Sequence, residues 1–177
     1  MGRLLSQDVG SAGLVLHDRS VPRSRANIDH IAVVPSGVWV IDTKRYRGRV
    51  RRGRPLGRLV GRRTLIVDGH DRGDLVAAAR RQRALVRTVT GPGVQVRAML
   101  CFAGAEWGLV ARPLSIDGVV IFWPKALVRA LARPGPLGPD QRAALAARIA
   151  GALPACTAPP DPNAPDALRP RPPHRRA

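Results

Sequence analysis

Two aspartates and a lysine lie within otherwise apolar sequence, in the stretch NIDHIAVVPSGVWVIDTK (27–44). Carboxylates bind hard divalent cations such as Mg²⁺, and an ammonium group beside them orients water or stabilises negative charge. Asp29, Asp42 and Lys44 can perform such chemistry together only if the fold brings them onto one surface.

The apolar runs of this stretch predict a β-hairpin. Two segments rich in Val and Ile flank a turn-like Pro-Ser pair. If Val34 pairs with Gly37, Asp29 faces Asp42 across the hairpin, and only a loop of odd length breaks this register. Directly opposite residues have Cβ atoms roughly 5 Å apart, so the two carboxylates repel each other. Lys44 follows on the same face because strand side chains alternate.

This constellation has two interpretations that the spacing leaves open. A bound metal ion would turn the repulsion into coordination, because Mg²⁺ prefers carboxylate and water oxygens. Alternatively, Lys44 neutralises two surface acids, since an Asp-x-Lys pattern is common on strands. The first interpretation predicts a catalytic centre, and the second predicts an ordinary strand surface.

A basic tract follows the hairpin, with no acid before Asp68. Arginines next to the acids would neutralise phosphates and give salt-sensitive binding with little sequence readout. Tyr46, the only tyrosine of the chain, either stacks on a base or packs at the strand end. No helix-turn-helix, zinc finger or RNA module is recognisable, so recognition of shape or ends is expected. The nucleic-acid-binding candidates are Arg45, Tyr46, Arg47, Arg49, Arg51, Arg52 and Arg54, and the tract continues with Arg58, Arg62 and Arg63.

The composition of the whole chain favours a polyanionic partner. The 177 residues carry a formal charge of +18, which predicts attraction to nucleic acid first and to an anionic membrane surface second. High-GC coding, which raises Arg, Ala, Gly and Pro together, is the alternative origin of this charge. Two cysteines form neither a disulfide framework nor a zinc pattern, and no signal peptide or membrane span is evident. We therefore expect a soluble, cytoplasmic protein.

Hydrophobic patterning predicts an α/β or α+β domain with a hairpin-based central sheet. Residues 1–13 show no periodicity, residues 14–153 form one domain, and residues 154–177 are a Pro/Arg-rich segment that we expect to be a disordered tail. Gly91 and Pro124 are suited to the end of one helix and the start of the next, and Asp140 is a possible N-cap. Strands are expected at 14–18, 26–34, 37–44, 63–69, 94–104 and 118–123, and helices at 73–91, 124–135 and 138–154.

The hairpin sequence closely resembles the NERD domain, a nuclease-related family within the PD-(D/E)xK superfamily. The matching motifs follow one another in fixed order: Ile28-Asp29-His30, Pro35-Ser36-Gly37-Val38, Ile41-Asp42-Thr43-Lys44 and Gly48. Weaker similarity extends to about residue 150. The resemblance implies a restriction-endonuclease-like fold, with a central mixed sheet and flanking helices, and metal-dependent cleavage of phosphodiester bonds.

The same resemblance implies roles for individual residues. By motif, Asp29 and Asp42 are the metal-binding acids, and Lys44 positions or activates the attacking water. Gln82 is the candidate for a glutamine that approaches the active site from the following helix, and a solvated glutamine is the alternative. The implied cofactor is Mg²⁺ or Mn²⁺, and the expected substrate is DNA.

One feature of the chain departs from the family pattern. Many such domains contribute an acid from a helix before the first strand, whereas here Asp8 is the sole acid among residues 1–13. A shortened helix, an upstream start and a decayed site are the three explanations that stay open. The leading hypothesis is therefore a metal-dependent deoxyribonuclease, with a catalytically inactive nucleic-acid-binding module as the alternative. A scaffold that recruits partners through its tail is a third hypothesis.

Overall fold

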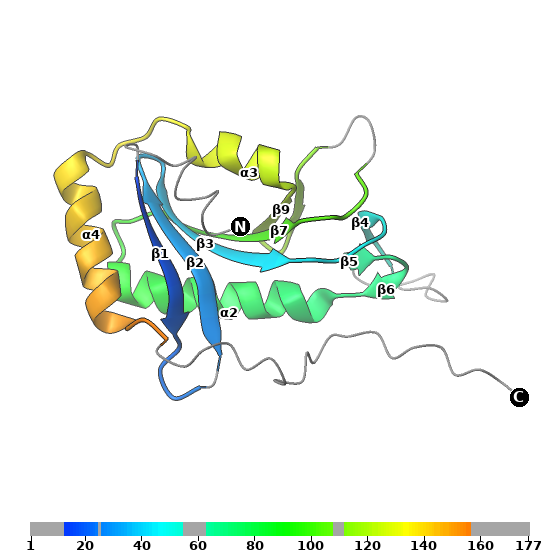
Figure 1. Ribbon diagram of the computed structural model, residues 1–177, viewed down its shortest axis with the longest axis horizontal. Coiled ribbons are helices and arrows are strands. Elements are labelled where there is room, and N and C mark those ends of the chain that lie inside the picture. The colour runs from blue at the N-terminus through cyan, green and yellow to red at the C-terminus, as the bar shows by residue number, and fades with distance from the viewer. Residues whose placement is uncertain (1–12, 25, 55–62, 108–111, 157–177) are drawn as a thin grey trace, which may run out of the picture.

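A mixed six-stranded sheet forms the centre of the protein (Figure 1). The computed structural model describes residues 13–24, 26–54, 63–107 and 112–156. Counted across the sheet from one edge to the other, each of the first three strands is antiparallel to its neighbour. The fourth and fifth strands run parallel to the third, and the sixth strand, at the far edge, is antiparallel to the fifth. In spatial order the strands are β1 (Leu14–Ser20), β2 (Asn27–Val34), β3 (Gly37–Lys44), β7 (Val96–Phe102), β9 (Val119–Phe122) and β8 (Leu114–Ile116).

Helices cover both faces of this sheet (Figure 1). The helices α2 (Gly73–Thr90) and α4 (Pro139–Ala152) pack on one face, and α3 (Pro124–Leu131) packs on the other. α2 ends where Gly91 takes a φ of 85°, and α3 begins with Pro124 in its first turn. The predicted fold class, a restriction-endonuclease-like mixed sheet with flanking helices, is confirmed.

β3 separates two apolar cores. Val38 and Val40 pack with residues of α2 and α4, whereas Trp39 and Ile41 pack with residues of α3. Because strand side chains alternate, Asp42 continues the row of Val38 and Val40 on the α2 face. The strand thus carries its acid and, two residues later, its lysine to the open end of a buried apolar row.

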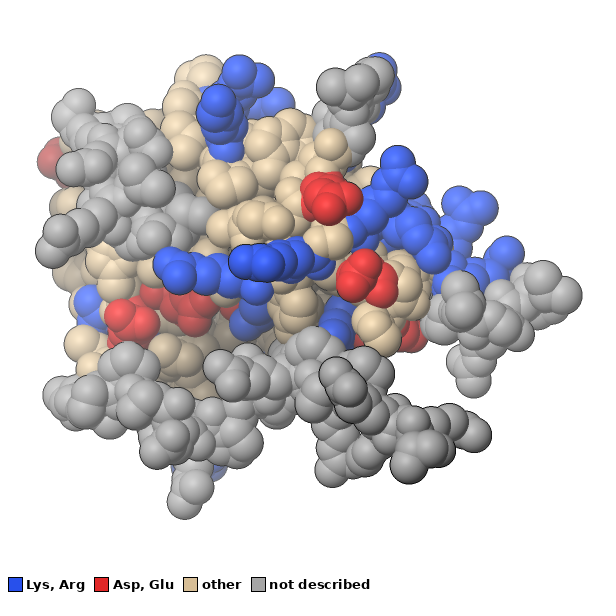
Figure 2. Space-filling model, turned by 45° about the vertical axis from the view of Figure 1, so that its right-hand side comes forward, with Lys and Arg blue, Asp and Glu red and all other residues tan. Residues whose placement is uncertain are grey.

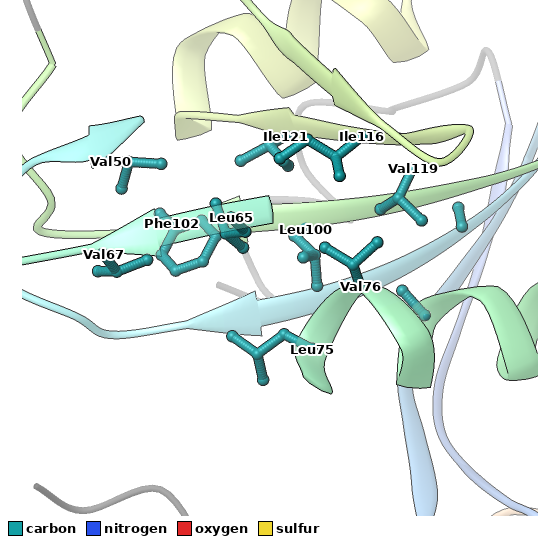
Figure 3. Packing of buried hydrophobic residues seen from close by; sticks show 12 residues of the cluster. Val50, Leu65, Val67, Leu75, Val76, Leu100, Phe102, Ile116, Val119 and Ile121 are labelled. Carbon is teal, nitrogen blue, oxygen red and sulfur yellow. The ribbon is translucent and has the colours of Figure 1, made fainter. Parts of the chain in front are cut away.

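A second, three-stranded sheet lies beside the C-terminal end of β3 (Figure 1). It consists of β4 (Val50–Gly53), β5 (Thr64–Val67) and β6 (His70–Asp71). Sequence patterning predicted only β5, because β4 has a single buried apolar residue among arginines and β6 is two residues long. The small sheet shares a core with α2 and β7, and Figure 3 shows among its members Val50, Leu65, Val67, Leu75, Val76, Leu100 and Phe102.

The start of α4 differs from the prediction. Gly138, rather than Asp140, occupies the N-cap position, and Asp140 lies within the first turn. The Gly138 N–H donates a hydrogen bond of 2.9 Å to the Oε1 atom of Gln141. The predicted Asp140 cap is therefore wrong, because a glutamine three residues inside the helix satisfies the free N–H group instead.

The chain that follows α4 returns to the sheet. The Ser20 N–H donates to the Pro154 carbonyl at 2.9 Å, and the Cys156 N–H donates to the Asp18 carbonyl at 2.7 Å. The first residues of the Pro-rich segment are thus hydrogen-bonded to β1, the edge strand.

Several predictions concern residues outside those described. They include most of the irregular N-terminal segment with Asp8, residues 157–177 of the disordered tail expected at 154–177, and Arg58 and Arg62 of the basic tract. These stay predictions. Within the described part of the chain, no helix is long and apolar enough to span a membrane.

Candidate active site

The hairpin has the predicted register. His30 pairs with Ile41, and every pair between these two residues and the Pro-Ser turn follows the same register, ending with Val34 opposite Gly37. One step beyond the last ladder pair, the Oδ2 atom of Asp29 accepts a hydrogen bond of 3.0 Å from the Thr43 N–H. The Asp29 side chain therefore reaches across to β3 and lies beside Asp42.

Asp42 is the most unusual carboxylate of the described residues. It is 6% exposed, and its Oδ1 atom lies 2.7 Å from the Lys44 Nζ atom. Burial raises the pKa of Asp42, Lys44 opposes this rise and the neighbouring Asp29 adds to it, and together these effects bring the pKa to about 6. A second positive charge at this position would therefore be strongly stabilising.

Lys44 stays protonated at neutral pH in this environment. Burial lowers the pKa of its ammonium group, but the Asp42 and Asp29 carboxylates raise it more, so the net pKa lies above the ordinary value. Lys44 can thus donate hydrogen bonds and stabilise negative charge, and it cannot act as a proton acceptor in this state.

Gln82 reaches the same end of the sheet from α2. Its Nε2 atom donates a hydrogen bond of 3.2 Å to the carbonyl of Asn27, two residues before Asp29 on β2. Its Oε1 atom is buried and has no hydrogen-bond partner among the described residues. The structure brings Gln82 to the strand that carries Asp29, and its catalytic role stays a prediction.

His30 lies on the opposite face of β2, as its position next to Asp29 predicts. It forms a cross-strand pair with His17 of β1, with a distance of 2.9 Å between the two Nδ1 atoms. Burial lowers the pKa of His30. The sequence did not indicate this pairing, because the two histidines become neighbours only through the register of β1 with β2.

The basic tract extends from the end of β3 into the small sheet. Figure 2 shows basic side chains gathered toward this part of the molecule, with acidic side chains beside them. The six arginines proposed as nucleic-acid contacts are exposed: Arg45, Arg47, Arg49, Arg51, Arg52 and Arg54.

Tyr46 packs within the protein instead of projecting from the tract. Its ring centroid lies 5.8 Å from that of Phe102 on β7, and the Arg72 guanidinium lies 5.2 Å from the Tyr46 centroid. These contacts agree with the packing interpretation of Tyr46. Sequence reasoning missed Arg72, which follows the acids Asp68 and Asp71 and so stands apart from the arginine run.

The described residues fit a divalent cation with few protein ligands. Asp29 and Asp42 supply two adjacent carboxylates, and Mg²⁺ commonly binds through one or two carboxylates while keeping several waters. The pKa of Asp42 is raised because Lys44 alone does not offset the effects of burial and of the Asp29 charge. A bound cation would stabilise the ionised form of this carboxyl. Among the described residues, no cluster of three or more His, Cys, Asp or Glu side chains suitable for a metal is present.

Fold and site together define the class of the protein. A mixed sheet with an aspartate at the start of β2 and an Asp-x-Lys pattern at the end of β3 is the arrangement of a restriction-endonuclease-like domain. The family model described as nuclease-related domain, NERD, matches residues 3–103, more than half of the chain. The chain belongs to this family. Searches of curated proteins and of solved structures found no significant match.

Proposed function

We propose that the protein is a metal-dependent nuclease that hydrolyses phosphodiester bonds in DNA. One observation supports the proposal above all others: a buried aspartate with a raised pKa lies between a second carboxylate and a lysine, at a sheet end that continues into an arginine tract. A surface pair of acids neutralised by a lysine would not require the burial of Asp42.

Asp29 and Asp42 are the residues that would hold Mg²⁺ or Mn²⁺. When bound, such an ion polarises the scissile phosphate and lowers the pKa of a bound water. Lys44, held by Asp42 and kept protonated, orients the attacking water or stabilises the negative charge that develops on the phosphate. Gln82 would complete the wall of the site from α2.

The exposed arginines next to this site would hold the nucleic acid. Contacts from Arg to phosphate oxygens are independent of sequence and release counterions, so binding should weaken steeply as salt concentration rises. DNA is the substrate that we propose, with cleavage directed by the shape or the ends of the nucleic acid rather than by base sequence.

The test is cleavage of plasmid, single-stranded DNA and RNA with Mg²⁺, Mn²⁺ or a chelator. Wild type is compared with Asp42→Ala and with Asp140→Ala, a matched control at an exposed acid in the first turn of α4. We expect metal-dependent cutting of DNA by wild type and by the control, and only background cutting by Asp42→Ala.

A catalytically inactive nucleic-acid-binding module is the second candidate. The observation that favours it is that the described residues contribute two carboxylates and no further acid to the site. This candidate predicts salt-sensitive binding without cutting by any of the three proteins. Metal-dependent cutting that Asp42→Ala retains would contradict the proposed active site.

A further inference from the structure

Arg72 is a charged residue next to the site that neither the motif nor the basic tract includes. It immediately precedes α2 and is partly buried, and its backbone N–H donates a hydrogen bond of 2.8 Å to the Leu65 carbonyl. Its guanidinium lies 5.2 Å from the centroid of the Tyr46 ring. The small sheet and the tyrosine ring therefore hold the side chain in one place.

The charge of Arg72 has no carboxylate partner among the described residues. Its Nε atom is buried without a hydrogen-bond acceptor, and no ion pair forms with a described acid. The adjacent acid, Asp71, uses its Oδ1 atom to accept hydrogen bonds from the Thr64 hydroxyl and the Gly73 N–H. The interaction with Tyr46 compensates part of the desolvation of a guanidinium, but its N–H donors still require acceptors.

The Tyr46 ring connects Arg72 to the catalytic lysine. Tyr46 also contacts Phe102, which pairs directly with Lys44 in the β3–β7 ladder. Burial lowers the pKa of Lys44, the Asp42 and Asp29 carboxylates raise it, and the Tyr46 side chain lies near enough to add to that rise. Arg72 thus stacks on a tyrosine whose side chain also lies near Lys44.

We propose that Arg72 is a phosphate-binding residue that positions the nucleic acid at the site, by donating hydrogen bonds to a backbone phosphate next to the one that reaches Lys44. The inference rests on the proposed function and adds one specific contact to it. A guanidinium suits this purpose because its planar fork binds two phosphate oxygens while its face stacks on an aromatic ring. A phosphate would supply an acceptor to a guanidinium whose Nε–H has none among the described residues.

The test is a thermodynamic cycle between this residue and single phosphates of the DNA. Binding of short oligonucleotides is measured by fluorescence anisotropy in an Asp42→Asn background, which prevents cleavage during the measurement. Each oligonucleotide carries one neutral methylphosphonate at a different position. The full-length Asp42→Asn protein is the parent, and it is compared with the same protein carrying Arg72→Gln or Arg72→Lys in addition. Arg80→Gln, at an exposed arginine of α2, is the matched control.

We expect one methylphosphonate position that weakens binding about tenfold in the parent and in the Arg80→Gln control, but has little effect in Arg72→Gln. Arg72→Lys should retain part of the coupling, because it keeps the charge and loses the fork. A purely structural role of Arg72 would lower the unfolding temperature without coupling to any phosphate.

Two outcomes overturn the inference, and they are distinguishable. If the parent binds DNA and every methylphosphonate has the same effect with and without the Arg72 substitutions, Arg72 does not bind a phosphate, and the proposed function is unaffected. If the parent binds no DNA at all, the proposed function on DNA fails together with the inference.

Discussion

Removing the charge of Asp42 should change how the stability of the protein depends on pH. The folded state raises the pKa of this carboxyl from 3.8 to about 6, first through burial and then through the charge of Asp29. Asp42→Asn keeps the shape of the side chain and removes the titration. The comparison therefore isolates the free energy linked to one proton.

The sign follows from which state loses the proton first. Well below pH 4 Asp42 is protonated in both states, and as the pH rises the unfolded chain releases its proton before the folded protein does. The stability that this carboxyl contributes is therefore present at low pH and is lost as the pH rises through about 6. A shift of roughly two pKa units corresponds to about 3 kcal/mol. Lys44 remains charged throughout this range and adds no pH dependence.

Urea unfolding of both proteins in chelator, from pH 4 to pH 7, measures this effect. We expect the free energy of unfolding of wild type, relative to Asp42→Asn, to fall by about 2.4 kcal/mol across this range, because part of the total effect is already lost at pH 4. Parallel stability curves would refute the reasoning, because they would mean that the Asp42 pKa is the same in both states. A relative rise in wild-type stability with pH would show that Lys44 outweighs burial.

Three further measurements address the metal, the lysine and the basic tract. Mg²⁺ at ten times its dissociation constant should stabilise wild type at pH 7 by about 1.4 kcal/mol and leave Asp42→Asn unchanged in thermal unfolding; equal stabilisation of both would place the ion elsewhere. Lys44→Ala should raise the pKa of Asp42 further above its usual range, because Lys44 opposes the existing shift. An NMR titration of the carboxyl carbon measures this pKa, and an unchanged value would contradict the ion pair. The double variant Arg51→Ala, Arg52→Ala should reduce the slope of log K against log salt concentration by about 2 if both arginines contact phosphates of duplex DNA; an unchanged slope would exclude both from the interface.

The sequence could predict the central hairpin because two independent signals agree. Val- and Ile-rich runs predict the two strands, and the Pro-Ser turn between them sets the loop length and therefore the register. Asp29 and Asp42 come together as a consequence of this register. The three helices were predictable because a Gly or Pro stands at one end of each.

The parts that the sequence could not predict depend on contacts between distant segments. β4 contains one buried residue, Val50, which becomes part of a core only when the small sheet packs on β7 and α2. Arg72 is next to Tyr46 only because the same sheet folds back before α2 begins. The raised pKa of Asp42 likewise needs a degree of burial that no local pattern specifies.

Anomalous diffraction from crystals grown with Mn²⁺ tests the central claim most directly, because it locates the ion without reference to activity. We predict a strong peak within direct coordination distance of the Asp29 and Asp42 carboxylates, and its loss in crystals of Asp42→Asn. Saturating Mn²⁺ with no peak at these carboxylates, or a peak that persists in the variant, would contradict a metal centre built on this hairpin.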